Sequence, residues 1–156
     1  MTRKQVLLRG VAAVAGVAGV LIGCASLAAH HEAGEPALAR TPAPPGAAVY
    51  LISPQDGATV SSPVTVRFGL TGMGVAPAGV LNPKAGHHHL IIDAPTPAAG
   101  APIPNDAKHR HFGGGQTEVE LELTPGKHTL QLVLGDHIHV PHDPPVVSQT
   151  ITVTVE

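Results

Sequence analysis

The chain is poor in aromatic residues and has a single cysteine. Only 2% of its 156 residues are aromatic and none is tryptophan, so a hydrophobic core has to be built from aliphatic side chains. The lone cysteine, Cys24, excludes an intramolecular disulfide. Methionine is equally scarce, with 2 in the whole chain, which argues against a methionine-rich carrier of Cu(I).

Charge is also limited, at 13% of residues, and positive charge is the scarcer sign, with 9 Lys and Arg against 11 Asp and Glu. Three of the basic residues, Arg3, Lys4 and Arg9, lie at the N-terminus. The rest of the chain is therefore acidic and offers no basic surface for nucleic acid. In place of charge and aromatics there are 18 Gly and 16 Pro, which favour turns and loops over long helices.

Residues 1–23 predict an export signal. The N-terminal basic residues precede an apolar stretch over residues 11–22 that is short for a membrane span and rich in small residues. It ends in Leu21-Ile22-Gly23-Cys24, which resembles the lipobox of bacterial lipoproteins. The resemblance implies a lipid anchor on Cys24; an ordinary signal peptide cut after Ala28 or Ala29 is the alternative. Either interpretation places the protein in the bacterial cell envelope, on the periplasmic side, lipid-anchored or soluble.

Residues 24–47 predict a flexible tether, because a run of Ala, Pro and Gly cannot bury a core. From residue 48 to 156 the pattern changes to short segments in which apolar and polar residues alternate, as in Val64–Leu70 and Leu130–Leu134. Pro-rich and Gly-rich turns separate these segments. We therefore expect an all-β domain over residues 48–156, an immunoglobulin-like β-sandwich of about six or seven strands.

Histidine is the one reactive residue type that is abundant, with 11 in the chain. Three His-x-His pairs lie at the ends of expected strands or in adjoining loops: His87 and His89, His109 and His111, His137 and His139. In an extended chain residues i and i+2 point to the same face, so each pair can offer two imidazoles to one metal ion.

The expected ligands are His87 and His89 with His137 and His139, on strands that are neighbours in one sheet. The Gly-rich segment that carries His109 and His111 is expected to close over the site, and His142 is a further candidate ligand. Two carboxylates are expected to accept hydrogen bonds from metal-bound imidazoles, namely Asp93 and Asp136. By contrast, His128 shares the inward parity of Leu130 and is expected to be a hydrogen-bonded structural histidine.

Several motifs carry a resemblance to a known family. Residues 86–93, 111–118, 125–132 and 135–137 resemble those of short exported bacterial domains known only as a domain of unknown function. The resemblance covers about residues 53–155 and implies no established activity. Residues 53–58 are also similar to the first strand and turn of periplasmic copper-resistance β-sandwich proteins.

Imidazole ligands suit copper and zinc. The sequence therefore favours an exported metal-binding protein for sequestration, delivery or sensing, with a metal ion, the membrane and an envelope protein as partners. One alternative is a small His-metal oxidoreductase, which needs an open coordination position. The other is a metal-free envelope module that binds a protein or glycan. No Gly-x-Ser-x-Gly, His-Glu-x-x-His or P-loop motif occurs, so an enzyme is the less favoured interpretation.

Overall fold

The computed structural model describes residues 38–156, so the expected export signal, Cys24 and most of the tether lie outside the described residues. This part of the chain forms strands and no helix, hence none that is long and apolar enough to cross a membrane. The strands are β1 (Ala48–Ser53), β2 (Thr59–Val60), β3 (Val64–Thr71), β4 (Gly74–Val75), β5 (Ala85–Ile92), β6 (His109–His111), β7 (Glu118–Leu121), β8 (Gly126–Gly135) and β9 (Ile151–Val155).

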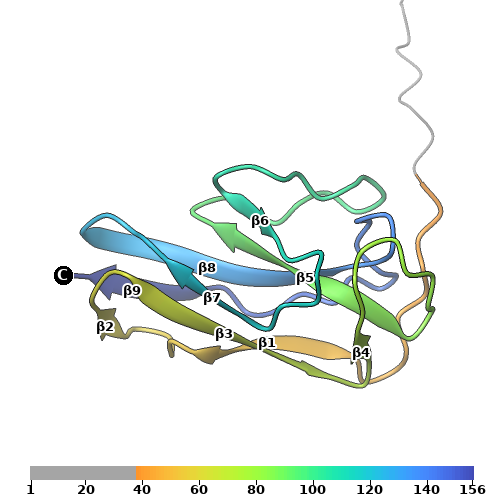
Figure 1. The fold of residues 1–156 in the computed structure, drawn as a ribbon, viewed down its shortest axis with the longest axis horizontal. Coiled ribbons are helices and arrows are strands. Elements are labelled where there is room, and N and C mark those ends of the chain that lie inside the picture. Colours follow the sequence, from red (N-terminus) through yellow and green to blue (C-terminus); the bar gives the residue numbers. More distant parts are fainter. Residues whose placement is uncertain (1–37) are drawn as a thin grey trace, which may run out of the picture. The chain divides into compact units, whose positions relative to one another are not determined.

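Two sheets pack against each other (Figure 1). The smaller has the order β1-β3-β7 and the larger the order β2-β9-β8-β5-β4. Strand β5 pairs with β8 along one edge, and along its other edge it pairs first with β4 and then with β6. The predicted all-β sandwich is confirmed. The structure adds three very short strands, β2, β4 and β6, to those expected from the alternating segments.

The core between the sheets is aliphatic, as the composition requires. Fully buried leucines and valines fill it from both layers: Val66 on β3, Leu90 on β5, Leu130, Leu132 and Leu134 on β8, and Val153 on β9. Each such burial contributes about 1.5–3 kcal/mol relative to exposure. The 2 phenylalanines of the chain, Phe68 and Phe112, lie against each other in this core with ring centroids 4.8 Å apart.

Every residue of β5 is buried, which means that both faces of this strand are covered. On the inner face His88 lies 5.2 Å from Phe68, ring centroid to ring centroid, within the core between the sheets. On the outer face Ile91 packs against Val133 of β8 and Ile103 of the connection that follows β5. Ile103 thus brings the Pro-rich connection onto the sheet. His87 and His89, which share the outer face with Ile91, are shielded from water.

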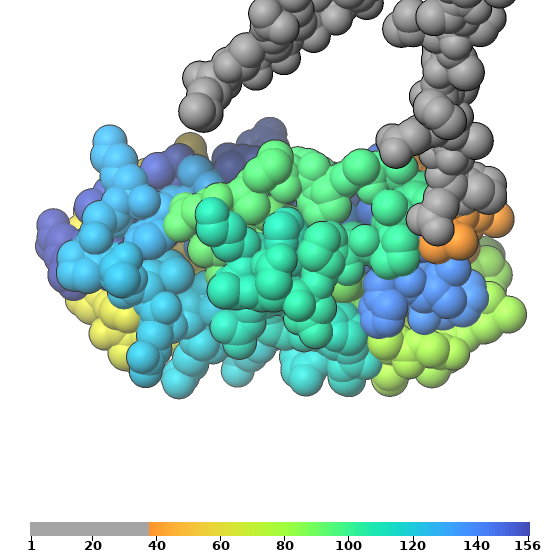
Figure 2. Space-filling model, turned by 90° about the horizontal axis from the view of Figure 1, so that it is seen from above, coloured from red at the N-terminus to blue at the C-terminus, as the bar shows by residue number. Residues whose placement is uncertain are grey.

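Residues 38–44, which we call the N-terminal strap, lie along the loop after β8 (Figure 2, orange beside blue). The Ala43 amide donates to the Asp143 carbonyl at 2.7 Å, and the Asp143 amide donates to the Thr41 carbonyl at 2.9 Å. The strap belongs to the segment expected to be a flexible tether. It is held mainly through backbone groups and polar side chains, a mode of packing that a search for apolar periodicity does not detect.

Candidate metal centre

Four histidines converge on the outer face of the larger sheet. One ring nitrogen from each lies within 4.8 Å of the others; the four-histidine cluster is His87, His89, His111 and His139. The Nε2 atom of His87 is 3.0 Å from Nδ1 of His139 and 3.0 Å from Nε2 of His89. Metal–nitrogen bonds of about 2.0–2.1 Å place the ligand nitrogens of one ion about 3–4 Å apart. The two separations of 3.0 Å fit this range, and the cluster could hold one ion if the wider separations, of up to 4.8 Å, close to it.

Three of the four imidazoles are placed by sheet geometry. His87 and His89 alternate with His88 along β5 and so share its outer face. His111 of β6 is the direct antiparallel partner of His89, which places its side chain on the same face. The backbone ladder thus aligns three imidazoles before any metal is considered.

His139 comes from a tight turn after β8. The buried carboxylate of Asp136 organises this turn: its Oδ1 accepts the amides of Ile138 and Val140, both at 3.0 Å. The His139 amide donates to the Asp136 carbonyl at 3.0 Å, and His139 has a φ of 68°. Strand β8 ends at Gly135 and residues 136–140 form a turn, so His137 and His139 do not share a face as residues in an extended chain would.

Two imidazoles of the cluster occupy space that a side chain on a neighbouring residue would fill, and in both cases that neighbour is a glycine. A Cβ at Gly135, which lies opposite His87 on β8, would be 2.9 Å from Nε2 of His89. A Cβ at Gly113 would be 2.6 Å from Nε2 of His111. Both distances are too short for any other residue type to fit without movement of the histidine. The sequence shows these glycines, but their role becomes apparent only once the rings are in place.

Burial favours the neutral form of three of the four imidazoles, those of His87, His89 and His111. It lowers the pKa of His87 to about 4 and the pKa of His89 to about 2, with the neighbouring imidazoles adding to both shifts. Burial, followed by the proximity of His139, also lowers the pKa of His111. At neutral pH these imidazoles are therefore neutral, and each has one ring nitrogen with a free lone pair, as metal binding requires. Within the described residues Nδ1 of His87, Nδ1 of His89 and Nε2 of His111 are buried without a hydrogen-bond partner.

The other histidines that were expected to be ligands lie outside the cluster. His109 is opposite Ile91 on the ladder, and its Nδ1 donates to Asp106 at 2.9 Å. His142 is buried, and its Nδ1 donates weakly to the Leu134 carbonyl at 3.4 Å. His137 is in the turn, where its carbonyl accepts the Gly79 amide. The structure thus brings together His87, His89 and His139 as expected, with His111 in the place expected for His137.

The two carboxylates that were expected to accept hydrogen bonds from metal-bound imidazoles, Asp93 and Asp136, have other partners. Besides the turn amides, Asp136 accepts the Thr41 hydroxyl at 2.7 Å. Burial would raise its pKa, but this bond and those from Val140 and Ile138 hold the pKa of Asp136 below its usual value. It contacts no cluster imidazole through a hydrogen bond; its charge favours protonation of the nearby His87. Asp136 therefore shapes the turn that carries His139.

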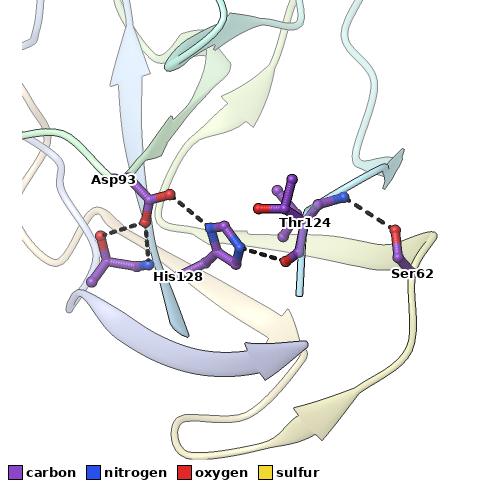
Figure 3. A network of polar contacts seen from close by, with 6 residues as sticks. Ser62, Asp93, Thr124 and His128 are labelled. Carbon is purple, nitrogen blue, oxygen red and sulfur yellow. Dashed lines mark hydrogen bonds and ion pairs between the residues drawn. The ribbon is translucent and has the colours of Figure 1, made fainter. Parts of the chain in front are cut away.

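Asp93 pairs with His128, away from the cluster (Figure 3). The Nδ1 atom of His128 donates to Asp93 at 2.7 Å and its Nε2 atom donates to the Thr124 carbonyl at 2.8 Å. Asp93 also accepts the Thr129 amide at 2.8 Å. The hydrogen bond that His128 donates to Asp93, followed by the one that it donates to the Thr124 carbonyl, raises the pKa of His128, because both stabilise the charged ring. His128 has the hydrogen-bonded, structural environment expected for it.

A β-sandwich whose larger sheet carries a buried cluster of four histidines is the class of protein that this fold and site define. Residues 66–156 match the family model described as "Domain of unknown function (DUF4399)", and the chain belongs to this family. The family resemblance predicted from the sequence motifs is thereby confirmed. The match begins within β3 and includes all four histidines of the cluster, whereas β1 and the strap precede it. No curated protein and no solved structure matches the chain.

Proposed function

We propose that this protein binds one copper or zinc ion through the four-histidine cluster. The observation that carries the proposal is the convergence of four ring nitrogens within 4.8 Å in a place where β5 is fully buried. Imidazole nitrogen is a good ligand for both metals. The low pKa values of His87 and His89 keep their lone pairs free of protons at neutral pH.

A purely structural network of hydrogen bonds accounts less well for the same geometry. A neutral imidazole has one donor and one acceptor. If Nε2 of His87 donates, it serves only one of the two ring nitrogens that lie 3.0 Å from it. If it accepts, the proton sits on Nδ1, which is buried without a partner among residues 38–156. Either arrangement leaves a buried polar atom unpaired at a cost of about 1–3 kcal/mol. A cation would accept the lone pairs of all the rings at once, whereas a hydrogen bond pairs the ring nitrogens only two at a time; Nδ1 of His87 and of His89 would lack a partner among residues 38–156 in either case.

The number of ligands favours binding over catalysis. Structural and storage sites for zinc have four protein ligands, whereas catalytic sites have three and keep one position for water or substrate. Four imidazoles fill a tetrahedral site, which supports sequestration, delivery or sensing ahead of an oxidoreductase. Zinc suits the tetrahedral arrangement, and copper is favoured by its higher intrinsic affinity for nitrogen ligands.

We place this activity in the cell envelope. The basic and apolar N-terminal segment and the lipobox-like residues before Cys24 support export and lipid anchoring. An envelope protein that donates or accepts the ion is then the expected partner for delivery.

The test is elemental analysis of the untagged protein, followed by titration of the metal-free protein with Cu(II) and with Zn(II). We expect one ion per chain. Single replacements by Ala at the cluster positions should weaken binding, whereas His109→Ala and His137→Ala are matched controls from the same His-x-His pairs as His111 and His139 and should bind as the wild type does. A wild-type protein that binds neither ion, or controls that lose the ion while cluster variants keep it, would overturn the proposal.

A further inference from the structure

We infer that Thr41 of the N-terminal strap is a positioning residue for the metal ligand His139, acting through the carboxylate of Asp136. This inference rests on the proposed function, because it concerns the same site. It assigns part of the metal affinity to a segment that precedes both β1 and the region matched by the family model.

The chain of contacts is short and continuous. The Thr41 hydroxyl donates to Oδ2 of Asp136 at 2.7 Å. The other carboxylate oxygen, Oδ1, accepts the amides of Ile138 and Val140, the two residues on either side of His139. Asp136 is 1% exposed, so water does not substitute for a missing partner without opening the turn. Thr41 therefore fixes the orientation of the carboxylate that fixes the turn.

The strap also holds the far end of the same loop. The Arg40 guanidinium donates to the carbonyls of Pro141 and His142 and forms an ion pair with Asp143 at 2.9 Å. The backbone of Asp143 pairs with the strap in both directions. The turn that carries His139 is thus bonded to the strap on both sides. Thr41 contacts Asp136, which precedes His139, and Arg40 contacts residues 141–143, which follow it.

His139 is the ligand that depends on such support. His89 is held by ladders on both edges of β5, His87 by the ladder with β8, and His111 by the β5–β6 ladder. His139 has a φ of 68°, a conformation that a residue other than glycine keeps only when its surroundings impose it. Loosening of Asp136 therefore affects this ligand first and leaves the other three in place.

The experiment compares Thr41→Val, which keeps the shape and removes the hydroxyl, with Thr41→Ser, which keeps the hydroxyl. Both are made in the full chain and titrated with Zn(II) and Cu(II) against a competing chelator. We expect Thr41→Val to weaken binding about tenfold, the lower end of the range for outer residues that orient ligands, and Thr41→Ser to bind as the wild type does. Arg67→Ala, which breaks an exposed ion pair with Glu118, is the control for a general loss of surface contacts.

Two further measurements separate positioning from a general structural effect. In a His139→Ala background Thr41→Val should cause no additional loss of affinity, because the ligand that it positions is gone. In the metal-free protein Thr41→Val should speed hydrogen exchange at the amides of Ile138 and Val140. The inference about Thr41 is overturned if Thr41→Val binds metal as the wild type does, or if it weakens binding as much in the His139→Ala background as in the wild type. Neither result affects the proposed function. A wild-type protein that binds no metal overturns the proposed function with it, whatever the exchange rates.

Discussion

His111 lies directly opposite His89 in the antiparallel ladder between β6 and β5, and the two rings are stacked at 5.0 Å between centroids. A segment of three residues thus brings its imidazole to the four-histidine cluster, because its backbone pairs with β5. The expectation that the loop bearing His111 closes over the site is replaced by a simpler arrangement, in which His111 belongs to β6 and extends the sheet.

Gly135→Ala should abolish tight metal binding without removing a ligand. The added Cβ would lie 2.9 Å from Nε2 of His89, so that ring has to move out of the cluster. We expect the affinity for Zn(II) to fall at least as far as for a variant that lacks His89, with a loss of stability of about 1–3 kcal/mol from overpacking. Gly114→Ala is the control, since its Cβ would meet only the flexible side chain of Gln116. Unchanged affinity in Gly135→Ala would contradict the placement of His89.

The metal-free protein should lose stability as the pH falls from about 6.5 toward 4. The unfolded chain protonates His87 and His89 near their ordinary pKa of 6.5, whereas burial lowers the pKa of the folded-state imidazoles to about 4 and about 2. The unfolded state therefore binds more protons in this window, and acid favours it by up to about 1.4 kcal/mol per pH unit for each imidazole. Urea unfolding at several pH values measures this. His89→Gln should show a shallower dependence; an equal slope in both proteins would count against the buried, neutral state.

His128→Ala should destabilise the fold by about 1 kcal/mol and leave metal binding unchanged. The pKa of His128 is raised above 6.5, so its contribution is complete below pH 6.5 and is lost as the pH rises through the raised value. Burial opposes ionisation of Asp93, but hydrogen bonds from Thr129 and His128 lower its pKa below 3.8, so its contribution is lost only in stronger acid. The difference between wild type and His128→Ala should thus be largest between about pH 4 and pH 6.5. Thermal unfolding across this range tests the window, and loss of metal in this variant would refute the structural role.

Cys24→Ser should move the protein from the membrane fraction to the soluble fraction. Stable anchoring requires acyl chains, and the Ala and Pro segment after Cys24 has no apolar face to replace them. Ser26→Ala, two residues away, is a control that keeps the anchor. Fractionation of cells that express each variant decides the matter, and membrane association of Cys24→Ser equal to that of the wild type would rule out a lipoprotein.

Much of the fold could be predicted because its residues obey simple periodicity. The alternation in Val64–Leu70 and Leu130–Leu134 gives β3 and β8 their buried faces, and the scarcity of aromatic residues leads to a core that is mainly aliphatic. The alternation of His87 and His89 with His88 likewise predicts that the pair shares one face. These features depend only on neighbours along the chain.

The rest of the site depends on tertiary contacts that local patterns do not contain. His137 and His139 look equivalent in the sequence, yet the turn that Asp136 organises brings only His139 to the cluster. Asp93 seemed well placed beside a ligand strand, but His128 reaches it from β8 across 35 positions of the chain. The role of Thr41 cannot be predicted from the sequence, because it depends on the contact of the strap with the loop after β8.

The two buried faces of β5 carry different sets of side chains: His87 and His89 lie on the outer face, and His88, Leu90 and Ile92 lie on the inner face. A shift of one residue in the pairing of β5 with β8 would exchange these faces, so that His88 would replace one histidine of the cluster and Leu90 or Gly86 would replace the other. His87 and His89 would then both be buried in the aliphatic core, where hydrogen-bond partners for imidazoles are scarce. If the cluster binds an ion as proposed, that ion would favour the alignment of β5 with β8 that keeps both histidines on the outer face.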